Sequence, residues 1–176
     1  MRRAWCNLAH RLPVALLVGS LVQAAASASA AAPAPSATAT NFEPTTVSLG
    51  AGQSATITIA AAGLGAGATG AQFDVLHNAA NTSISDPQCV GILVGANVNQ
   101  ATRPDGDLLA CTFAAGGASG TSGDVLTFTL TNSGGGAETI SLNTASTLYL
   151  TSTFAAEAPG TTNSLTVTSP TSPAGG

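Results

Sequence analysis

Few residues of this sequence carry side chains that could perform catalysis. His77 is the one histidine beyond residue 30, and a hydrolase would pair such a base with a serine or cysteine nucleophile. No serine lies in the Gly-x-Ser-x-Gly turn that exposes many such nucleophiles. The acidic residues are scattered singly and form no recognisable glycosidase pair. We therefore expect His77 to be a packing or surface residue, and the protein to be no enzyme, with no catalytic residues.

Two carboxylates could bind a hard cation. Asp105 and Asp107 lie beside a Pro-Asp-Gly sequence, and clustered oxygens of this kind bind calcium. A calcium loop of the EF-hand type needs further acidic ligands at fixed offsets, whereas Leu108 and Leu109 come next. The sequence favours a plain hairpin turn here, and we expect no metal site.

The segment Gly65–Gly70 matches the Gly-x-Gly-x-x-Gly spacing of dinucleotide-binding loops. That loop works only when it opens a helix whose N-terminus holds the pyrophosphate. A strand-like run, Ala71–His77, follows instead. We interpret the match as chance in a chain rich in Gly and Ala, and expect no cofactor.

Three cysteines occur, of which Cys6 lies in the leader described next. Cys89 and Cys111 remain as an even pair, and an exported protein meets an oxidising compartment. We expect a disulfide between them. The alternative is two buried free thiols, since a sandwich core accepts cysteine as a small hydrophobic residue.

The first 30 residues have the three parts of a secretory signal peptide. A basic start, Met1–Arg11, precedes the apolar run Leu12–Val22 and the Ala-x-Ala sites of Gln23–Ala32. The apolar run is shorter than the roughly 20 residues that span a bilayer. We predict cleavage near Ala30, no membrane insertion of the mature chain, and a secreted, cell-surface or periplasmic location.

Charge excludes two classes of partner. The chain has no lysine, and beyond the leader Arg103 stands alone against eight acidic residues, a net charge of −7. Nucleic-acid affinity depends on clustered Lys and Arg that neutralise phosphates, and anionic lipid attracts the same residues. We therefore expect neither nucleic acid nor a lipid surface as a partner.

Hydrophobic residues beyond the leader alternate with a period of two. Ile57 and Ile59 alternate with threonines, as do Leu126, Phe128 and Leu130, which is typical of half-buried strands. Glycine-rich breaks separate about nine such runs, and this pattern predicts an all-β antiparallel sandwich. The predicted strands are Thr45–Leu49, Ala55–Ala60, Ala71–His77, Gly91–Val98, Leu108–Phe113, Val125–Thr131, Thr139–Leu142, Thr147–Leu150 and Ser164–Thr168.

The predicted organisation has four parts. A signal peptide (1–30) is followed by a Pro/Ala/Thr-rich spacer (31–42), the sandwich (43–168) and a Ser/Pro/Gly tail (169–176). Both low-complexity segments lack the apolar residues needed for a core.

Three segments in order resemble cohesin domains, which receive dockerins in cellulosomes and share their architecture with some carbohydrate-binding modules. They are Val47–Ile59 (VSLGAGQSATITI), Gly70–Ile84 (GAQFDVLHNAANTSI) and Pro104–Leu130 (PDGDLLACTFAAGGASGTSGDVLTFTL). The resemblance implies a jelly-roll topology and a non-catalytic, secreted or surface module with a dockerin-like protein partner. The alternative is a carbohydrate-binding module that recognises polysaccharide.

The resemblance also implies where a partner would bind. In cohesins one sheet face, including the strand similar to Ala71–His77, forms much of the partner surface. Gln72, Asp74 and Leu76 alternate on one side of that strand, opposite Phe73 and Val75. These three residues are the predicted contact positions.

Overall fold

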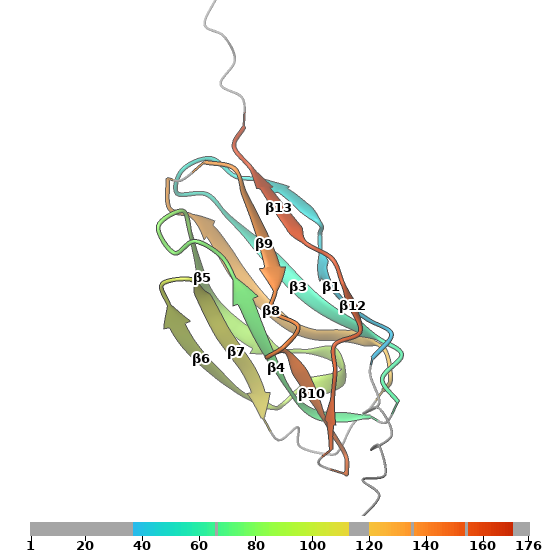
Figure 1. The fold of residues 1–176 in the computed structure, drawn as a ribbon. Helices are drawn as coiled ribbons and strands as arrows, with labels where there is room; N and C mark the ends of the chain where they lie inside the picture. Colours follow the sequence, from blue (N-terminus) through green and yellow to red (C-terminus); the bar gives the residue numbers. More distant parts are fainter. Residues whose placement is uncertain (1–36, 66, 113–119, 135, 154, 171–176) are drawn as a thin grey trace, which may run out of the picture. The chain divides into compact units, whose positions relative to one another are not determined.

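Two β-sheets pack face to face in the computed structural model, which describes residues 37–65, 67–112, 120–134, 136–153 and 155–170 (Figure 1). The five-stranded sheet has the spatial order β12 (Thr161–Thr162), β1 (Ala39–Glu43), β3 (Ser54–Ala62), β8 (Gly123–Asn132) and β5 (Thr82–Cys89). The all-β sandwich predicted from the alternation is therefore confirmed.

The eight-stranded sheet is built around β4 (Ala68–Leu76). On one side of β4 lie β7 (Gly106–Thr112) and then β6 (Asn97–Arg103), which forms an edge. The other side of β4 pairs first with β10 (Leu148–Thr151) and then with β9 (Glu138–Leu142). Beyond β10 lies β11 (Ala156–Glu157), and beyond β9 lie β13 (Leu165–Thr168) and β2 (Thr46–Ser48).

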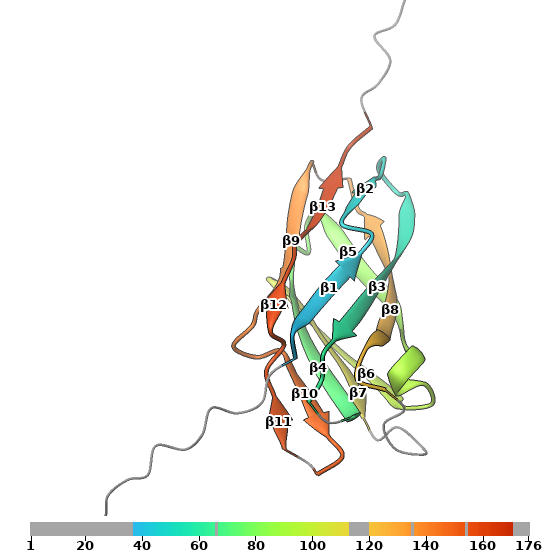
Figure 2. The same cartoon turned by 90° about the vertical axis from the view of Figure 1, so that its right-hand side faces the viewer.

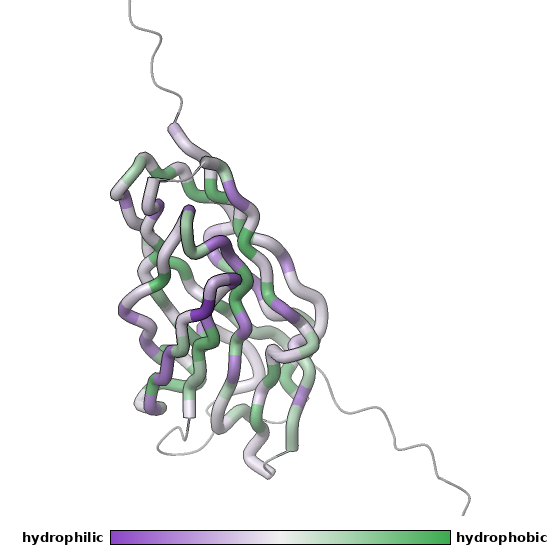
Figure 3. Tube along the Cα trace, turned by 60° about the vertical axis from the view of Figure 1, so that its left-hand side comes forward, coloured by the Kyte–Doolittle hydropathy of each residue, from purple (hydrophilic) through white to green (hydrophobic). Residues whose placement is uncertain are grey.

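Alternating side chains from both sheets fill the core. Ile57 and Ile59 of β3 are opposite Phe128 and Leu126 of β8, and all four are buried. The eight-stranded sheet contributes residues such as Phe73, whose ring lies 5.7 Å from that of Tyr149 in an edge-to-face arrangement. Figure 3 shows the resulting alternation of hydrophobic and hydrophilic residues along the strands. Each large apolar side chain buried in this way contributes about 1.5–3 kcal/mol to folding.

The first and last strands run parallel to each other in both sheets (Figure 2). β1 pairs with β12 in the five-stranded sheet, and β2 pairs with β13 in the eight-stranded sheet. The remaining pairings are antiparallel. The N-terminal and C-terminal segments of the sandwich therefore lie side by side in both sheets.

The sandwich begins earlier than the sequence indicates. The structure places Ala39–Glu43, most of which falls in the predicted spacer, in β1. Phe42 is fully buried there, and its N–H donates to Asn163 Oδ1 at 2.7 Å. The Ala/Thr composition hides this strand because its other inward residue, Thr40, is polar. Residues 1–36 and 171–176, with the predicted signal peptide, lie outside the described residues.

The predicted strand Gly91–Val98 is wrong. A 3₁₀ turn, η1 (Gly91–Leu93), occupies its first part, and Ile92 and Leu93 are buried there. Only Asn97 and Val98 are extended, as the start of β6. Ile92 and Leu93 are consecutive and both cover one end of the core, so they do not alternate between core and solvent. A short run of hydrophobic residues does not by itself distinguish such a turn from a buried strand, which explains the wrong prediction.

Besides β1 and the two-residue strands β11 and β12, two further strands gave no recognisable signal, β5 and most of β6. β5 contains Asp86, which has a positive φ of 50°, and its register against β8 shifts between Ser85 and Gln88. A proline follows at 87, as is common in edge strands and at bulges. β6 is a polar edge strand, so its sequence lacks the alternation of a half-buried one.

The predicted disulfide is present in the structure. Cys89 at the end of β5 bonds to Cys111 of β7, with Cα atoms 5.8 Å apart. β5 and β7 belong to different sheets, so the bond joins the two layers covalently. A disulfide closing a loop of this separation stabilises a fold by roughly 3 kcal/mol in the chain-entropy model.

Candidate partner-binding face

The solvent-facing side of β6, β7, β4 and β10 forms one continuous surface, which we call the outer face. Pairing aligns Asn99, Ala110, Gln72 and Leu148 in one row across the four strands. Because side chains alternate along each strand, residues two positions away in each strand share this side. The outer face comprises Gly70, Gln72, Asp74 and Leu76 of β4, Leu108, Ala110 and Thr112 of β7, Asn97, Asn99, Ala101 and Arg103 of β6, and Leu148 and Leu150 of β10.

Four leucines make this surface apolar. Leu76, Leu108, Leu148 and Leu150 are each partly exposed, in contrast to the buried residues that alternate with them. Sheets that cover a core on one side normally present polar residues on the other. Leucines on three adjacent strands depart from that pattern, and grouped exposed apolar residues are typical of interaction sites.

A depression lies between β7, β4 and β10 on the outer face. Its volume is about 170 Å³, and it is lined by Gly70, Ala71, Gln72, Ala110, Cys111, Thr112, Leu148 and Leu150. Gly70 contributes no side chain to this lining. A Cβ atom there would lie 2.9 Å from the carbonyl oxygen of Cys111, so the close approach of β4 to β7 requires glycine.

Asp74 lies beneath the outer face and organises it. Its side chain is only 3% exposed, and its carboxylate accepts hydrogen bonds from Arg103, Ser146 and Asn143. Burial acts to raise the pKa of Asp74, but these hydrogen bonds and the charge of Arg103 outweigh it and hold the pKa below its usual value. Asp74 thus fixes the β6 edge and the β9–β10 loop, which carries Ser146 and Asn143, around β4.

Arg103 carries the one cationic side chain of the outer face. Its guanidinium pairs with Asp74, and its Nε lies 3.9 Å from the exposed Asp105 carboxylate. With 38% of the side chain exposed, Arg103 presents charge at the edge of the apolar region. The Asp74 carboxylate is therefore shielded by the arginine above it.

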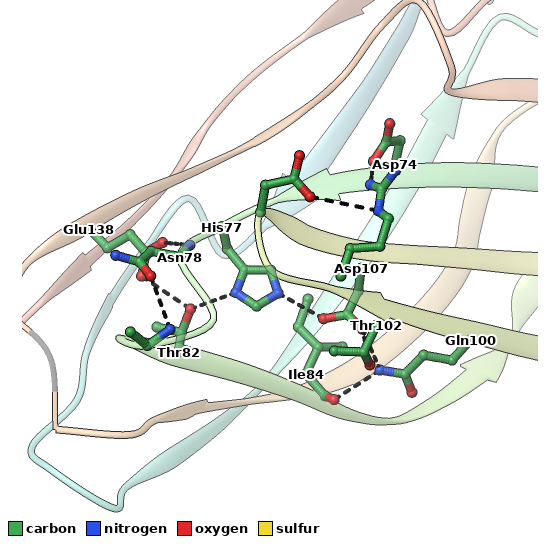
Figure 4. Close-up of polar contacts among 12 residues, drawn as sticks. Asp74, His77, Asn78, Thr82, Ile84, Gln100, Thr102, Asp107 and Glu138 are labelled. Atoms are coloured by element: carbon green, nitrogen blue, oxygen red, sulfur yellow. Dashed lines mark hydrogen bonds and ion pairs between the residues drawn. The ribbon is translucent and has the colours of Figure 1, made fainter.

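A second polar cluster lies inside the same end of the sandwich (Figure 4). His77 is buried between two polar side chains: Nε2 lies 2.7 Å from Asp107 Oδ2, and Nδ1 lies 3.0 Å from Thr82 Oγ1. The Thr82 hydroxyl donates to Glu138 Oε2 at 3.1 Å. The cluster connects β4, β7, β5 and β9, and so ties both sheets together.

Asp107 is the centre of this cluster. Besides the contact with His77, its Oδ1 accepts from Thr102 Oγ1 at 2.7 Å and from Gln100 Nε2 at 2.9 Å. Burial acts to raise the pKa of Asp107, but the hydrogen bonds from Thr102, Gln100 and His77 outweigh it and lower the pKa. Gln100 also donates to Ile84 O at 2.9 Å, so β6 is bound to the opposite sheet.

The order Asp107, His77, Thr82 matches the carboxylate, imidazole and hydroxyl of a hydrolase triad. Its surroundings do not suit that chemistry. The side chains of His77 and Asp107 are 1% exposed, and Thr82 is fully buried with its hydroxyl donating to Glu138. A substrate cannot reach this hydroxyl, and the cluster has a structural role.

The structure separates the two carboxylates considered for calcium. Asp105 lies in the β6–β7 turn with its side chain 76% exposed, whereas Asp107 points inward to His77. The predicted hairpin turn is confirmed. Across the described residues, no group of three or more His, Cys, Asp and Glu side chains could hold a metal ion.

The predicted contact residues lie where the alternation puts them, on one side of β4. Gln72 and Leu76 are partly exposed, and Gln72 Nε2 donates to Ser146 O at 2.9 Å. Sequence reasoning missed Arg103, Leu108, Leu148 and Leu150 because they come from three other strands. Strand order, which alternation alone does not give, brings them beside β4.

The last three residues of the Gly-x-Gly-x-x-Gly match, 68–70, are the start of strand β4 and open no helix. Tyr149, the one tyrosine of the chain, is fully buried, and its hydroxyl lies 2.8 Å from Thr40 Oγ1. Burial raises the pKa of Tyr149 well above the usual value. The hydrogen bond with Thr40 acts to lower this pKa, and the charge of Glu157 acts to raise it further.

No helix within the described ranges is long and apolar enough to cross a membrane.

Comparison with known proteins identifies the fold. No protein-family model and no curated protein matches the sequence. The solution structure of CaCohA2 from Clostridium acetobutylicum is similar with a TM-score of 0.61 at 13% identity, covering 78% of this chain and 95% of that one. A chain of the crystal structure of a CaDoc0917–CaCohA2 complex gives 0.60 at 14% identity, covering 74% and 97%.

A third structure, the cohesin module of a family 33 glycoside hydrolase from Clostridium perfringens, gives a TM-score of 0.57 at 14% identity. It covers 75% of this chain and 98% of the module. At such identities the likeness establishes architecture. The chain has the cohesin fold, as the resemblance of its three segments implied.

Proposed function

We propose that this protein is a secreted or cell-surface, non-catalytic module that binds a dockerin-type protein through its outer face. The cohesin fold supports this proposal, and one structural neighbour, CaCohA2, is described in a complex with CaDoc0917. The observation that carries it is the outer face itself, where three adjacent strands present partly exposed leucines and two of these leucines, Leu148 and Leu150, line a depression.

The rigidity of the outer face supports a role in recognition. Asp74 holds β6 and the β9–β10 loop to β4, and Asp107 holds β6 to β7 and His77. A surface fixed before binding loses little conformational freedom when a partner docks. Both clusters therefore favour binding by a pre-formed surface.

The burial of the triad-like cluster is consistent with a binding role. The one triad-like arrangement among the described residues is enclosed in the sandwich, as shown by the burial of His77, Asp107 and Thr82.

Polysaccharide binding has less support, since modules of that class stack sugars on exposed aromatic rings. Each aromatic ring in the described ranges is buried: Phe42, Phe73, Phe128 and Tyr149.

Gln72 and Leu76 are proposed as direct contacts, together with Leu108 and Leu148. Asp74 is proposed to act through Arg103, because the arginine lies between its carboxylate and solvent. Reversing the charge of Asp74 would place two cations in contact beneath the surface. Such a variant would test folding as much as binding, so the leucines are better probes.

Secretion rests on the leader sequence. Its basic start, apolar run and Ala-x-Ala sites predict export and cleavage near Ala30, and the Cys89–Cys111 disulfide fits an oxidising compartment. Mass spectrometry of protein recovered outside the cell should give an N-terminus near residue 31. An intact leader on cytosolic protein would contradict this part of the proposal.

Binding is tested by calorimetry of the secreted chain against a panel of purified dockerins. We expect saturable binding to at least one, and at least tenfold weaker binding for Leu108→Asp and for Leu148→Asp. Thr56→Asp is the matched control, because Thr56 is exposed on the opposite sheet. No binding by a correctly folded chain, or equal losses for all three variants, would count against the proposal. Retention on insoluble polysaccharide instead would favour the carbohydrate-binding alternative.

A further inference from the structure

We infer that the depression over Gly70 is a socket for one aliphatic or phenyl side chain, presented by a segment of the partner that also carries Lys or Arg. This inference rests on the proposed function, since it assigns the anchor of the partner that docks on the outer face. It names the chemistry of the occupant from the shape, lining and charge of the site.

The socket exists because one residue lacks a side chain. Gly70 pairs with Leu150 of β10, and Ala110 of β7 lies opposite the next outer-face residue of β4, Gln72. Glycine and alanine therefore adjoin at the place where larger side chains would otherwise meet. Leu148 and Leu150 form one wall, and Thr112 forms part of the opposite wall.

The lining selects an apolar occupant. Among the lining residues only Gln72 and Thr112 have polar side chains, and the Gln72 amide already donates to Ser146 O at 2.9 Å. No charged side chain lines the depression. Water in such a site finds few partners, so its release by an apolar group is favourable.

The size selects a single side chain. The depression measures about 170 Å³, and an apolar cavity of about 150 Å³ accommodates a benzene molecule. A leucine, isoleucine or phenylalanine side chain is of this size, whereas an indole is larger. Hot spots of protein interfaces are commonly anchors of this kind, enclosed in a pocket near the centre of the contact.

The acidic character of the chain favours a partner segment with basic residues. The described residues contain eight acidic side chains and one arginine, and that arginine is paired with Asp74. Asp105, with its side chain 76% exposed, lies at the other end of the outer face from Gly70, because its neighbour Gly106 pairs with Leu76. A partner segment that carries Lys or Arg away from the anchor, towards this end, would be attracted to the surface, and one with Asp or Glu would be repelled.

The socket can be tested without a partner. Toluene titrated into the ¹⁵N-labelled chain should shift the amide signals of Gly70, Ala71 and Thr112 selectively. Ala110→Leu, which adds volume at the lining, should abolish these shifts. Ala101→Leu is the matched control, because Ala101 lies on the outer face in β6 but not in the lining. Unselective shifts, or equal behaviour of the two variants, would overturn the inference.

The second arm uses a dockerin that binds in the calorimetric panel. Ala110→Leu should weaken its binding about thirtyfold, the size of a hot-spot loss, whereas Ala101→Leu should change it less than threefold. Alanine replacement of one Leu, Ile or Phe in the dockerin should match the Ala110→Leu loss without adding to it. Additive losses, or full affinity of Ala110→Leu, would overturn the inference and leave the proposed function standing. Toluene binding without any dockerin binding would instead support the socket and contradict the proposed function.

Discussion

The Asp107 carboxylate lies 2.7 Å from His77 Nε2, and this contact joins β7 to the residue that directly follows β4, inside the end of the sandwich. The other ring nitrogen reaches Thr82 on the facing sheet. One imidazole thus connects three strands of two layers. The contribution of this contact to the free energy of unfolding can be measured by replacing Asp107 with an uncharged residue.

Asp107→Asn should destabilise the fold by about 1–3 kcal/mol, the usual cost of leaving a buried hydrogen-bonding group without its partner. The new amide would also face donors on Thr102 and Gln100. Urea denaturation followed by circular dichroism measures the change. Asp105→Asn, two residues away on an exposed turn, should alter the free energy of unfolding by less than about 0.5 kcal/mol. Similar losses for both variants would show that the cluster contributes little.

Stability should depend on pH through Asp74 and Asp107, whose pKa values are both lowered in the fold. Their contribution is fully present above the pKa of an unfolded aspartic acid, about 4. It is lost as the pH falls through the lower pKa values of the folded protein, because protons then bind the unfolded chain more readily. Urea denaturation between pH 7 and pH 2.5 should show a constant plateau followed by a fall. A flatter acid limb is expected for Asp74→Asn, and an unchanged one for Asp105→Asn.

Loss of the Cys89–Cys111 bond should lower the free energy of unfolding by roughly 3 kcal/mol. The double variant Cys89→Ala/Cys111→Ala measures it by urea denaturation. Adding a reductant should weaken the wild-type protein towards the variant and leave the variant unchanged. A variant as stable as the oxidised protein would show that packing alone joins the two layers.

Gly106→Ala should destabilise the protein by about 2–4 kcal/mol, because of both strain and overpacking. Gly106 has a φ of 151°, and an added Cβ would lie 2.1 Å from Val75 O. Gly136→Ala is the control, since nothing lies within 4 Å of the Cβ position there. Thermal unfolding of the two variants should differ by several degrees. Equal melting temperatures would contradict the close approach of β4 and β7.

Much of the fold was predictable because its core strands alternate strictly. Ile57, Ile59, Leu126 and Phe128 face inward as expected, and the same period placed Gln72, Asp74 and Leu76 together on one side of β4. Two of the strands that escaped prediction, β5 and β6, are polar or bulged edges, where pairing with one neighbour suffices and no hydrophobic pattern is needed. β6 is the clearest case, and it carries Arg103, the partner of Asp74. β1 escaped because one of its two inward residues, Thr40, is polar.

The character of the candidate site was less predictable than its place. Alternation shows which side of β4 a residue occupies, but not that Arg103 and the β9–β10 loop enclose Asp74. The socket depends on Gly70 and Ala110 becoming neighbours across two strands that are distant in sequence. Gly70 and Ala110 are neighbours because of the register in which β4 pairs with β7. The hydrophobic pattern within each strand does not show which strands pair or which of their residues lie opposite each other. Whether Gln72, Asp74 and Leu76 take part in binding stays a prediction.

The parallel pairing of the terminal strands has a mechanical consequence. Residues 39–48 and 161–168 run in the same direction through both sheets, so the beginning of the first segment and the end of the second lie at opposite ends of the sandwich. Tension applied at these two points would pull the paired strands lengthwise past each other. The hydrogen bonds of both parallel pairings would then have to break together instead of one after another, so the sandwich would resist extension in this direction.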